Sequence, residues 1–361
     1  MNTKERNNLY TKLAFNQAEI NLGSTAKNPS VGCVIVKNNS VVSSSCTSLN
    51  GRPHAEAQAL NKKINFKKAK MYVTLEPCSH YGLTPPCTKK IISKKIDKVF
   101  YSIEDVDPRS KSLAKKKLKK GKVNVQKNIL KTYANYFYKS YFNQITKKLP
   151  LVDAKIALSK DYLTINKKNK WITNKNSRKV THLLRSKYNC IVSSSQTLNE
   201  DNSMLNCRIE GLEKKSPDVV ILDRYFKIKK NLNIFKNKQF RKIYLVTKVK
   251  NLAKEKFFKN LGVFIITISS HNKQLEELFF ILKNKGFHRI LVESGVTLLN
   301  EMLKNKLINN LYVFKSSDNL KNLGYNRSSI DLIKSFRLIK KNRIEINLKN
   351  DNLYKVKIKN V

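Results

Sequence analysis

The sequence has few cysteines, and it lacks both a long apolar segment and an apolar N-terminal leader. Its six cysteines are scattered over 361 residues, which is too few for a disulfide scaffold and indicates reduced thiols. No apolar run approaches the about 20 residues that cross a bilayer, and the first residues lack the apolar core of a secretory signal peptide. We therefore expect a cytoplasmic protein that does not bind membranes.

Acidic residues and arginine are scarce as well. The chain has 25 Asp and Glu against 73 Lys and Arg, for a formal charge of +48, and only 12 of the basic residues are arginine. Proteins that read nucleic acids rely on arginine because its planar fork binds phosphates and base edges in a bidentate manner. Here the lysines are spread along the whole chain, which favours a solvated cationic surface over a specific nucleic-acid interface. Such a surface would still attract anionic phosphate substrates.

The length and the order of the predicted elements indicate two α/β domains. A chain of this length holds about two domains of about 150 residues each, and no GxGxxG fingerprint of a Rossmann site is present. In the first half, helices and strands alternate, which predicts a mostly parallel sheet covered on both faces. The helices are expected at about 5–22, 54–62, 88–95 and 129–145, and the strands at 31–36, 41–44, 71–75 and 98–103. On the first helix, Leu9, Leu13, Ala14 and Ala18 share one side.

A second α/β series follows. Lys147, Lys148 and Pro150 interrupt the pattern, so we expect one domain at 1–147 and another at 148–361. Strand candidates in the second domain lie at 171–173, 190–195, 218–223, 242–247, 262–268 and 289–294.

Two short motifs carry the chemistry of the first domain. One is HAE at His54–Glu56, and the other is YVTLEPCSHYGLTPPC at Tyr72–Cys87. The imidazole of His54 and the thiolates of Cys78 and Cys87 are the ligand types that zinc prefers. Three protein ligands leave the fourth tetrahedral position for water, so the set predicts a catalytic rather than a structural zinc site.

Glu56 lies two residues after His54. Residues two apart in a regular helix point to different sides, so both can serve one metal site only at a helix start, which Gly51 and Pro53 upstream favour. There Glu56 would act as general base and general acid, taking a proton from water and passing it to leaving ammonia. Either motif alone is better explained by a plain helix start or by buried cysteines. Together they match the H-x-E…P-C signature of zinc deaminases, with a wider gap between the cysteines.

The combination of NPSVGCVIV, HAE and TLEPCSHYGLTPPC resembles the deaminase half of the bifunctional riboflavin-biosynthesis deaminase–reductases. In that family, the long loop between the two cysteines carries the same HYGxTPPC text. The resemblance implies that Asn28 holds the pyrimidine and that His80 and Thr84 lie near the substrate. The family's DPNP loop is represented by Asp107–Ser110, which departs from it at its last two positions.

The resemblance continues into the second domain. The family's reductase half is similar in fold to dihydrofolate reductase and opens with a lysine shortly before a Ser-x-Asp-Gly turn. Here Lys155 precedes Ser159–Tyr162, with Tyr162 in place of the glycine. The segment 182–208 resembles the family's helix, strand and nucleotide loop, and 291–295 resembles its closing strand and loop.

The same resemblance implies roles for individual residues of this half. Lys155 and Asp201 would polarise or protonate the sugar of the substrate, and arginine forks suit its phosphate. Substrate contacts are implied for Asn169, Arg185, Leu205, Arg208 and Glu293, and cofactor contacts for Ala157, Trp171, Thr197, Asp201, Gly295, Val296, Thr297 and Leu298.

These expectations describe a two-step enzyme with a cytidine-deaminase-like α/β/α domain and a dihydrofolate-reductase-like α/β domain. The first would deaminate 2,5-diamino-6-(5-phosphoribosylamino)pyrimidin-4-one with one Zn²⁺ per chain. The second would use NADPH to reduce the ribose to a ribityl chain, with the cofactor supplying the hydride. We expect a small phosphorylated pyrimidine as partner, no specific nucleic acid, no membrane, and a homo-oligomer.

Two other interpretations stay open. A nucleic-acid-editing deaminase with an RNA-binding second half would explain the charge. It predicts a two-residue cysteine spacing and aromatic-rich basic stretches, and the sequence shows neither. A chain whose second half is degenerate and only scaffolds a dimer is kept open by the lost glycines, and NADPH titration would separate it from an active reductase.

Overall fold

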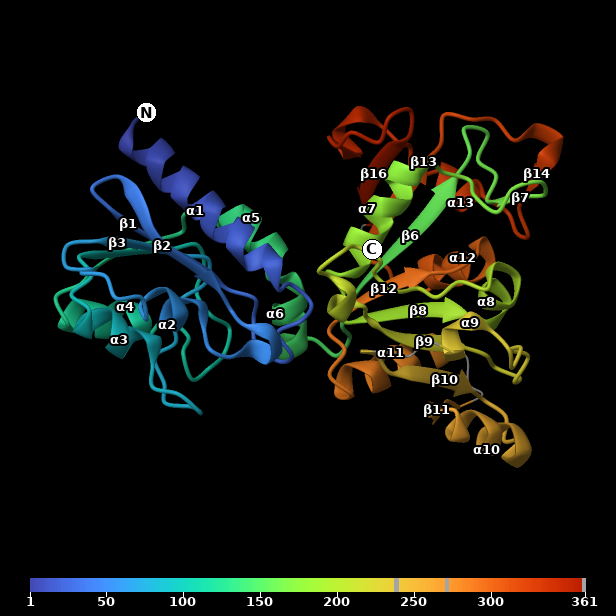
Figure 1. Ribbon diagram of the computed structural model, residues 1–361, viewed down its shortest axis with the longest axis horizontal. Helices are drawn as coiled ribbons and strands as arrows, with labels where there is room; N and C mark the ends of the chain where they lie inside the picture. Colours follow the sequence, from blue (N-terminus) through green and yellow to red (C-terminus); the bar gives the residue numbers. More distant parts are fainter. Residues whose placement is uncertain (237–239, 270–272, 359–361) are drawn as a thin grey trace. The chain divides into compact units, whose positions relative to one another are not determined.

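The chain forms two compact units, Met1–Lys148 and Leu149–Val361, shown in Figure 1. A computed structural model describes residues 1–236, 240–269 and 273–358. Within these ranges, no helix has both the length and the apolar character needed to cross a membrane. Each unit has its own sheet and its own hydrophobic core.

The first unit contains a five-stranded sheet in the order β2-β1-β3-β4-β5. Its strands are β1 (Gly32–Lys37), β2 (Ser40–Cys46), β3 (Lys70–Val73), β4 (Lys98–Tyr101) and β5 (Asn124–Lys127). Strand β1 runs antiparallel to both β2 and β3, whereas β3, β4 and β5 are parallel. The expectation of a mostly parallel sheet is therefore wrong for this unit. Only Asn38 and Asn39, both with positive φ, join β1 to β2, and a parallel crossover needs a dozen or more residues.

Helices cover both faces of this sheet, as expected. Figure 1 shows α1 on one face and α2, α3 and α4 on the other. The strands can be buried on both sides because their apolar residues point alternately to each face: Val34 and Tyr72 pack with α1, whereas Cys33 and Met71 join the core under α2 and α3. The helices are α1 (Thr3–Ile20), α2 (Ala55–Ala59), α3 (Cys87–Ser93), α4 (Ala114–Lys120), α5 (Lys131–Phe137) and α6 (Lys139–Thr146).

The buried side of α1 differs from the predicted side. Leu9 and Leu13 are 43% and 36% exposed, because the helix turns two polar residues toward the sheet instead. The hydroxyl of Tyr72 donates to Oδ1 of Asn7 over 2.8 Å, which satisfies this polar group inside the core. The buried positions of α1 are Asn7, Thr11, Ala14, Phe15 and Ala18.

The second unit contains a nine-stranded sheet in the order β11-β10-β9-β8-β12-β6-β13-β16-β15. The strands from β11 to β13 in this order are parallel, and β16 and β15 add an antiparallel edge. Its strands are β6 (Leu151–Leu158), β8 (Cys190–Ser194), β9 (Asp218–Leu222), β10 (Ile243–Thr247), β11 (Val263–Thr267), β12 (Arg289–Glu293), β13 (Asn310–Lys315), β15 (Arg343–Ile344) and β16 (Asn352–Lys357). A separate pair joins β7 (Ile165–Asn166) to β14 (Gly324–Tyr325).

The sequences of the parallel strands are short apolar runs because helices cover the sheet and bury these strands. The helices of this unit are α7 (Lys175–Arg185), α8 (Ser195–Asp201), α9 (Asn233–Lys236), α10 (Leu252–Asn260), α11 (Gln274–Asn284), α12 (Val296–Lys304) and α13 (Asp331–Lys334). The expected strand at 171–173 is wrong, since this segment is a loop before α7. There the ring of Trp171 packs against the guanidinium of Arg178, whose Cζ lies 4.6 Å from the ring centroid.

The turn after β6 is retained although tyrosine replaces the family's glycine. The backbone N–H of Tyr162 donates to the carbonyl of Ser159 over 3.1 Å. Tyr162 adopts a φ of 65°, in the left-handed region that glycine tolerates best. Its ring lies under the ammonium of Lys315, 3.8 Å from Nζ to the centroid. The turn therefore forms as the motif predicts, although Tyr162 adopts a backbone conformation that is unfavourable for a residue with a side chain.

Candidate metal centre and cofactor cavity

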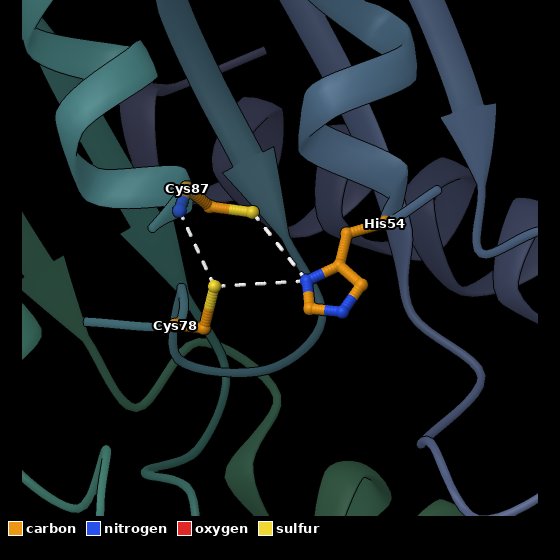
Figure 2. A group of neighbouring side chains, drawn as sticks. All are labelled: His54, Cys78 and Cys87. Atoms are coloured by element: carbon orange, nitrogen blue, oxygen red, sulfur yellow. Dashed lines mark hydrogen bonds between the residues drawn. The ribbon is translucent and has the colours of Figure 1, made fainter. Parts of the chain in front are cut away.

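Three side chains from separate segments of the first unit meet at one point. His54 is the N-cap residue of α2, Cys78 lies in the segment after β3, and Cys87 is the first residue of α3. Figure 2 shows the imidazole turned toward both sulfur atoms. Nδ1 of His54 lies 3.6 Å from Sγ of Cys78 and 3.6 Å from Sγ of Cys87. In the described part of the chain, this is the one group of three such ligand side chains that could hold a metal ion.

These distances fit a zinc ion. With Zn–S bonds of about 2.3 Å and a Zn–N bond of about 2.0 Å, tetrahedral geometry places sulfur and nitrogen about 3.6 Å apart. The hydrogen bond with Cys87, assisted by His54, lowers the pKa of the Cys78 thiol to about 4. The backbone N–H of Cys87 also donates to Sγ of Cys78 over 3.2 Å. Cys78 is therefore readily a thiolate, the form that binds metal.

Glu56 lies next to the cluster and is only 4% exposed. The backbone of His54 is extended, with φ −68° and ψ 155°, so the predicted helix start between the two residues is confirmed. Burial, followed by the charge of Cys78, raises the pKa of Glu56 to about 7. A carboxyl group with such a pKa can both accept and donate a proton near neutral pH.

The residues expected near the substrate lie on or against the segments that carry the ligands. Nδ2 of Asn28 donates to the carbonyl of Gly51 over 2.8 Å, which places Asn28 against the segment leading to His54. Oγ1 of Thr84 accepts a hydrogen bond from Nη1 of Arg52 over 2.8 Å. Arg52 was not predicted as a site residue, although its position two residues before a metal ligand was a usable signal.

The side chain of His80 is hydrogen-bonded to a residue from another segment of the first unit. Its Nδ1 lies 2.8 Å from Oγ of Ser110, a residue at which the chain departs from the family's DPNP loop. The sequence comparison did not indicate that this departure brings a hydroxyl group to the histidine. Arg109, the other departing residue, forms an ion pair of 2.6 Å with Asp107.

A second residue that sequence reasoning missed is Glu76, the glutamate of the EPC motif. Its carboxylate accepts hydrogen bonds from the backbone N–H groups of Asp105, Ser112 and Ala114 over 3.1, 3.0 and 2.9 Å. Glu76 is 3% exposed. It therefore ties the segment that carries Ser110 to the segment that carries Cys78.

The second unit contains a cavity of about 640 Å³ at the carboxyl ends of its central strands. Lys155 and Ala157 of β6, Ser194 of β8, Leu222 of β9 and Glu293 of β12 line it. In open α/β sheets, ligands bind in such a crevice outside the carboxyl ends of parallel strands. The reductase residues expected from the resemblance all line this cavity except Asn169: they are Lys155, Ala157, Trp171, Arg185, Thr197, Asp201, Leu205, Arg208, Glu293, Gly295, Val296, Thr297 and Leu298.

Asn169 has a local role instead. Its backbone N–H donates to Oδ1 of Asn166 over 3.2 Å, and its own Oδ1 accepts from the backbone N–H of Trp171 over 3.3 Å. The structure therefore places Asn169 in the turn that positions Trp171, and not on the cavity wall.

A buried carboxylate organises the substrate end of the cavity. Glu293 accepts two hydrogen bonds from Arg185, with Nε–Oε1 at 2.7 Å and Nη2–Oε2 at 3.0 Å, and Nζ of Lys155 lies 3.8 Å from Oε2. Although burial acts in the opposite direction, Arg185 and Lys155 hold the pKa of Glu293 below its ordinary value. Burial lowers the pKa of Lys155, and the charge of Glu293 limits this effect.

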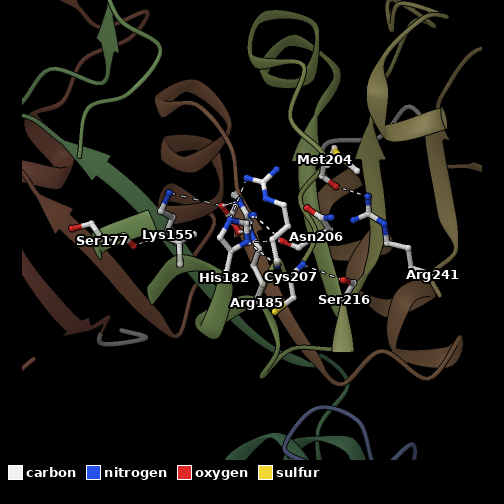
Figure 3. A network of polar contacts seen from close by, with 12 residues as sticks. Lys155, Ser177, His182, Arg185, Met204, Asn206, Cys207, Ser216 and Arg241 are labelled. Atoms are coloured by element: carbon white, nitrogen blue, oxygen red, sulfur yellow. Dashed lines mark hydrogen bonds and ion pairs between the residues drawn. The ribbon is translucent and has the colours of Figure 1, made fainter. Parts of the chain in front are cut away.

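His182, on α7, joins the two arginines and was not predicted. Figure 3 shows it close to Arg185 and Asn206. Its Nδ1 lies 2.8 Å from the carbonyl oxygen of Asn206, and its Nε2 lies 3.2 Å from Nη2 of Arg208. Burial, followed by the charge of Arg185, lowers the pKa of His182 to about 4. A neutral imidazole therefore donates through Nδ1 and accepts from Arg208 through Nε2.

The segment that carries Leu205 and Arg208 is anchored at two further points. Arg241 donates to the carbonyl of Met204, and the backbone N–H of Cys207 donates to Oγ of Ser216 over 3.0 Å. Leu205 is 4% exposed and also packs into a core cluster. Arg208 is exposed, so its guanidinium is the more available of the two arginines for a ligand.

The part of the cavity formed by the start of α12 suits a nucleotide phosphate. Helix α12 begins after Gly295, and its first backbone N–H groups belong to residues that line the cavity. A capping glycine has no side chain to satisfy these groups, and a helix N-terminus attracts anions. The backbone N–H of Gly295 donates to Oγ1 of Thr197 over 3.0 Å. A Cβ atom at Gly295 would meet only Thr197, at 3.7 Å, so the approach to this backbone is open.

The two units therefore define a zinc-dependent deaminase of the cytidine deaminase type joined to a reductase. Residues 4–103 match the family model of the cytidine and deoxycytidylate deaminase zinc-binding region, and residues 152–317 match that of the RibD C-terminal domain. The chain is 32% identical over 308 residues to the riboflavin biosynthesis protein RibD of Aquifex aeolicus, covering 84% of this chain and 85% of that protein. It is 31% identical over 310 residues to the RibD of Actinobacillus pleuropneumoniae, covering 84% and 82%.

Solved structures agree with this match. The RibD of Acinetobacter baumannii is 25% identical, with a TM-score of 0.81 over 99% of this chain and 100% of that one. A deaminase/reductase from Thermotoga maritima, 24% identical, has the same fold, with a TM-score of 0.81 over 99% and 100% of the two chains. The chain belongs to the RibD family. It is a bifunctional deaminase and reductase of riboflavin biosynthesis that uses Zn²⁺ and NADPH, which confirms the predicted function over the two alternatives.

Proposed function

We propose that residues 1–147 deaminate 2,5-diamino-6-(5-phosphoribosylamino)pyrimidin-4-one and that residues 148–361 reduce the ribose of the product. The Thermotoga maritima relative carries the name diaminohydroxyphosphoribosylaminopyrimidine deaminase/5-amino-6-(5-phosphoribosylamino)uracil reductase. The observation that carries the proposal is that each unit contains the groups required for its own reaction. The first holds the ligand cluster with Glu56 beside it, and the second holds the cavity around Lys155.

In the deaminase unit, His54, Cys78 and Cys87 would hold the zinc ion. A zinc ion in such a site lowers the pKa of a bound water toward neutrality. The carboxylate of Glu56 takes a proton from the attacking water and returns it to the amino nitrogen of the substrate. The carbon–nitrogen bond then breaks, and water has been exchanged for ammonia.

Asn28 and His80 would position the ring and the sugar of this substrate. Asn28 is hydrogen-bonded to the segment that leads to His54, and His80, two residues after Cys78, is hydrogen-bonded to Ser110. Such fixed groups can orient the reacting carbon, which is worth more to catalysis than additional binding.

In the reductase unit, the residues that line the cavity would hold NADPH, which would supply a hydride to C1′ of the ribose. Lys155 is the proposed proton donor to the ring oxygen as the sugar opens, because burial lowers its pKa and eases release of the proton. Asp201, which also lines the cavity, is the second candidate for polarising the sugar. Arg208 would bind the substrate phosphate, while Arg185 is mainly engaged with Glu293.

The metal assignment has a test that does not depend on activity. Zinc content measured by mass spectrometry should be about one per chain, and replacing Cys78 or Cys87 by serine should remove the metal. Glu56→Gln should retain it, because the carboxylate is not a ligand. Loss of zinc from Glu56→Gln with the fold intact would contradict this assignment.

The reaction itself is tested by incubating the purified chain with the diamino substrate, with and without NADPH. Mass spectrometry should find the deaminated compound without NADPH and the ribityl compound with it. Absence of both products from zinc-loaded protein would refute the proposal.

Further properties follow as proposals. We propose that the chain does not recognise a specific nucleic acid, since its excess charge lies mostly in dispersed lysines. We propose a cytoplasmic location because the six cysteines are too few and too scattered for a disulfide scaffold. Assembly into a homo-oligomer stays a prediction, which light scattering of the purified chain can test.

A further inference from the structure

Beside the ligand cluster, Arg52, His80 and Thr84 bring polar groups to one point. Nη1 of Arg52 donates to Oγ1 of Thr84 over 2.8 Å. Its other terminal nitrogen, Nη2, lies near Gly82: a Cβ atom there would be 3.5 Å from Nη2 of Arg52 and 3.9 Å from Nε2 of His80. Because residue 82 is glycine, no side chain occupies this position. The guanidinium and the imidazole therefore face the same small volume.

Hydrogen bonding indicates that His80 presents an N–H group to this volume. Nδ1 of His80 lies 2.8 Å from Oγ of Ser110. The same oxygen accepts from the backbone N–H of Ser79 over 3.4 Å, so the hydroxyl hydrogen of Ser110 is available for Nδ1. In the neutral imidazole the remaining proton then lies on Nε2, which is directed to the side of Arg52.

Arg52 also differs from Arg109 in its contacts with acidic residues. Arg109 forms a bidentate contact with Asp107, with Nε–Oδ1 at 3.0 Å and Nη2–Oδ2 at 2.6 Å. For Arg52, the structure shows no carboxylate within ion-pair distance among the described residues, and its contact is with the neutral hydroxyl of Thr84. A guanidinium without a counter-ion, next to a hydroxyl and an N–H donor, is suited to bind a phosphate.

The position of these groups relates them to the metal site. Arg52 lies two residues before His54, His80 two residues after Cys78, and Thr84 three residues before Cys87. Each ligand segment thus contributes one polar group to the same neighbourhood.

We propose that Arg52, with His80 and Thr84, binds the 5′-phosphate of the deaminase substrate while the pyrimidine ring occupies the zinc site. The phosphate oxygens accept hydrogen bonds from Nη2 of Arg52, Nε2 of His80 and the hydroxyl of Thr84. This proposal rests on the proposed deaminase function. It assigns the residue that makes the first unit prefer a phosphorylated substrate to the free riboside.

The test compares the phosphorylated substrate with its dephosphorylated riboside in the zinc-loaded full chain without NADPH. Arg52→Gln should raise KM for the phosphorylated compound about 10- to 100-fold, the range expected for lost hydrogen bonds to a charged group. Its kcat should change less than about twofold, since Arg52 does not touch the reacting atoms. KM for the riboside should stay the same. Arg52→Lys should recover part of the loss, because it keeps the charge without the fork.

Arg109→Gln is the matched control, because it removes an arginine charge that is already paired with Asp107 while leaving Arg52 in place. Its KM for both compounds should remain close to that of the unchanged chain. An equal rise of KM for both compounds in Arg52→Gln, or no rise for either, would overturn the proposal. A fall in kcat with KM unchanged would also overturn it, because it would indicate a role in the chemical step.

A binding measurement separates this proposal from the proposed reaction. If the chain deaminates neither compound, the proposed substrate is wrong, and ribose 5-phosphate then serves as the probe in calorimetry. The protein carries Arg208→Gln to weaken binding in the reductase cavity. Loss of binding in the double variant Arg208→Gln, Arg52→Gln supports the phosphate site. Equal binding by the single variant Arg208→Gln and by the double variant refutes it.

Discussion

The buried carboxylate of Glu293 offers a direct test of how the second unit is held together. Both of its oxygens face cations, with Arg185 at 2.7 and 3.0 Å and Lys155 at 3.8 Å. The side chains of Glu293 and Arg185 are only 7% and 11% exposed. Glu293→Gln keeps the shape of the side chain but removes the charge that balances two buried cations.

The expected loss of stability is about 3 kcal/mol. Removing one partner of a buried ion pair costs about 3–5 kcal/mol, because an uncompensated charge remains inside, and the glutamine oxygen can still accept one hydrogen bond from Arg185. The matched control is Glu301→Gln. Glu301 pairs with Arg224 at 2.5 Å, but these side chains are 37% and 27% exposed, so breaking this pair should cost less than about 1 kcal/mol.

The assay is urea unfolding followed by tryptophan fluorescence. The chain has one tryptophan, Trp171, and it lies in the second unit, so the signal reports the unfolding of that unit alone. If the free energies of unfolding of Glu293→Gln and Glu301→Gln differ by less than about 1 kcal/mol, the buried network does not have the proposed strength.

The effect should also depend on pH in a defined direction. Arg185 and Lys155 hold the pKa of Glu293 below its ordinary value of 4.5. A carboxylate with a depressed pKa stabilises the fold above the pKa of the unfolded chain and loses this effect as pH falls through the folded value. The stability difference between the unchanged chain and Glu293→Gln should therefore be complete above pH 4.5 and should shrink below it.

Three further predictions follow from other features. Tyr162→Gly should be more stable than Tyr162→Ala by about 1 kcal/mol in the same unfolding assay, because both lose the ring but only glycine relieves the left-handed φ of 65°; the reverse order would show that the turn is not strained. The basic limb of the reductase pH profile should move to lower pH in Glu293→Gln, since the carboxylate raises the pKa of Lys155, and an unmoved limb would exclude Lys155 as the proton donor. Filter binding should find RNA affinity that is independent of sequence and falls at least about tenfold between about 50 and about 200 mM salt, as for exposed lysines; tight binding to one RNA at the higher salt would contradict the reading of the charge.

The grouping of His54, Cys78 and Cys87 could be predicted from the sequence because the signal is local. His54 and Glu56 are two residues apart, and both cysteines lie in one motif, so residue type and spacing alone indicate the metal. The extended backbone at His54 also follows from this spacing. Ser110 and Glu76 depend on contacts across about 30 residues, and no spacing rule reports such contacts.

The fold class could be predicted from the sequence, but the direction of every strand and the buried side of every helix could not. The hairpin of β1 and β2 turns on two asparagines with positive φ, a connection too short for the parallel sheet that the alternating pattern suggested. In α1, Asn7 faces the core because Tyr72 satisfies its amide oxygen, which a hydropathy pattern cannot anticipate. In the reductase unit, nearly all of the residues that the resemblance implied line the cavity, but the resemblance did not supply His182.

The central claim is that one chain holds two separate sites for consecutive reactions, and one paired assay tests it most directly. Glu56→Gln is supplied with the deaminated intermediate and NADPH, and separately with the diamino substrate. Sites without shared groups are close to additive, so this variant should oxidise NADPH on the supplied intermediate at the rate of the unchanged chain. On the diamino substrate it should lose at least about 10²-fold in deamination. Loss of NADPH oxidation on the supplied intermediate, with zinc and fold intact, would contradict the two-site account and require one composite site.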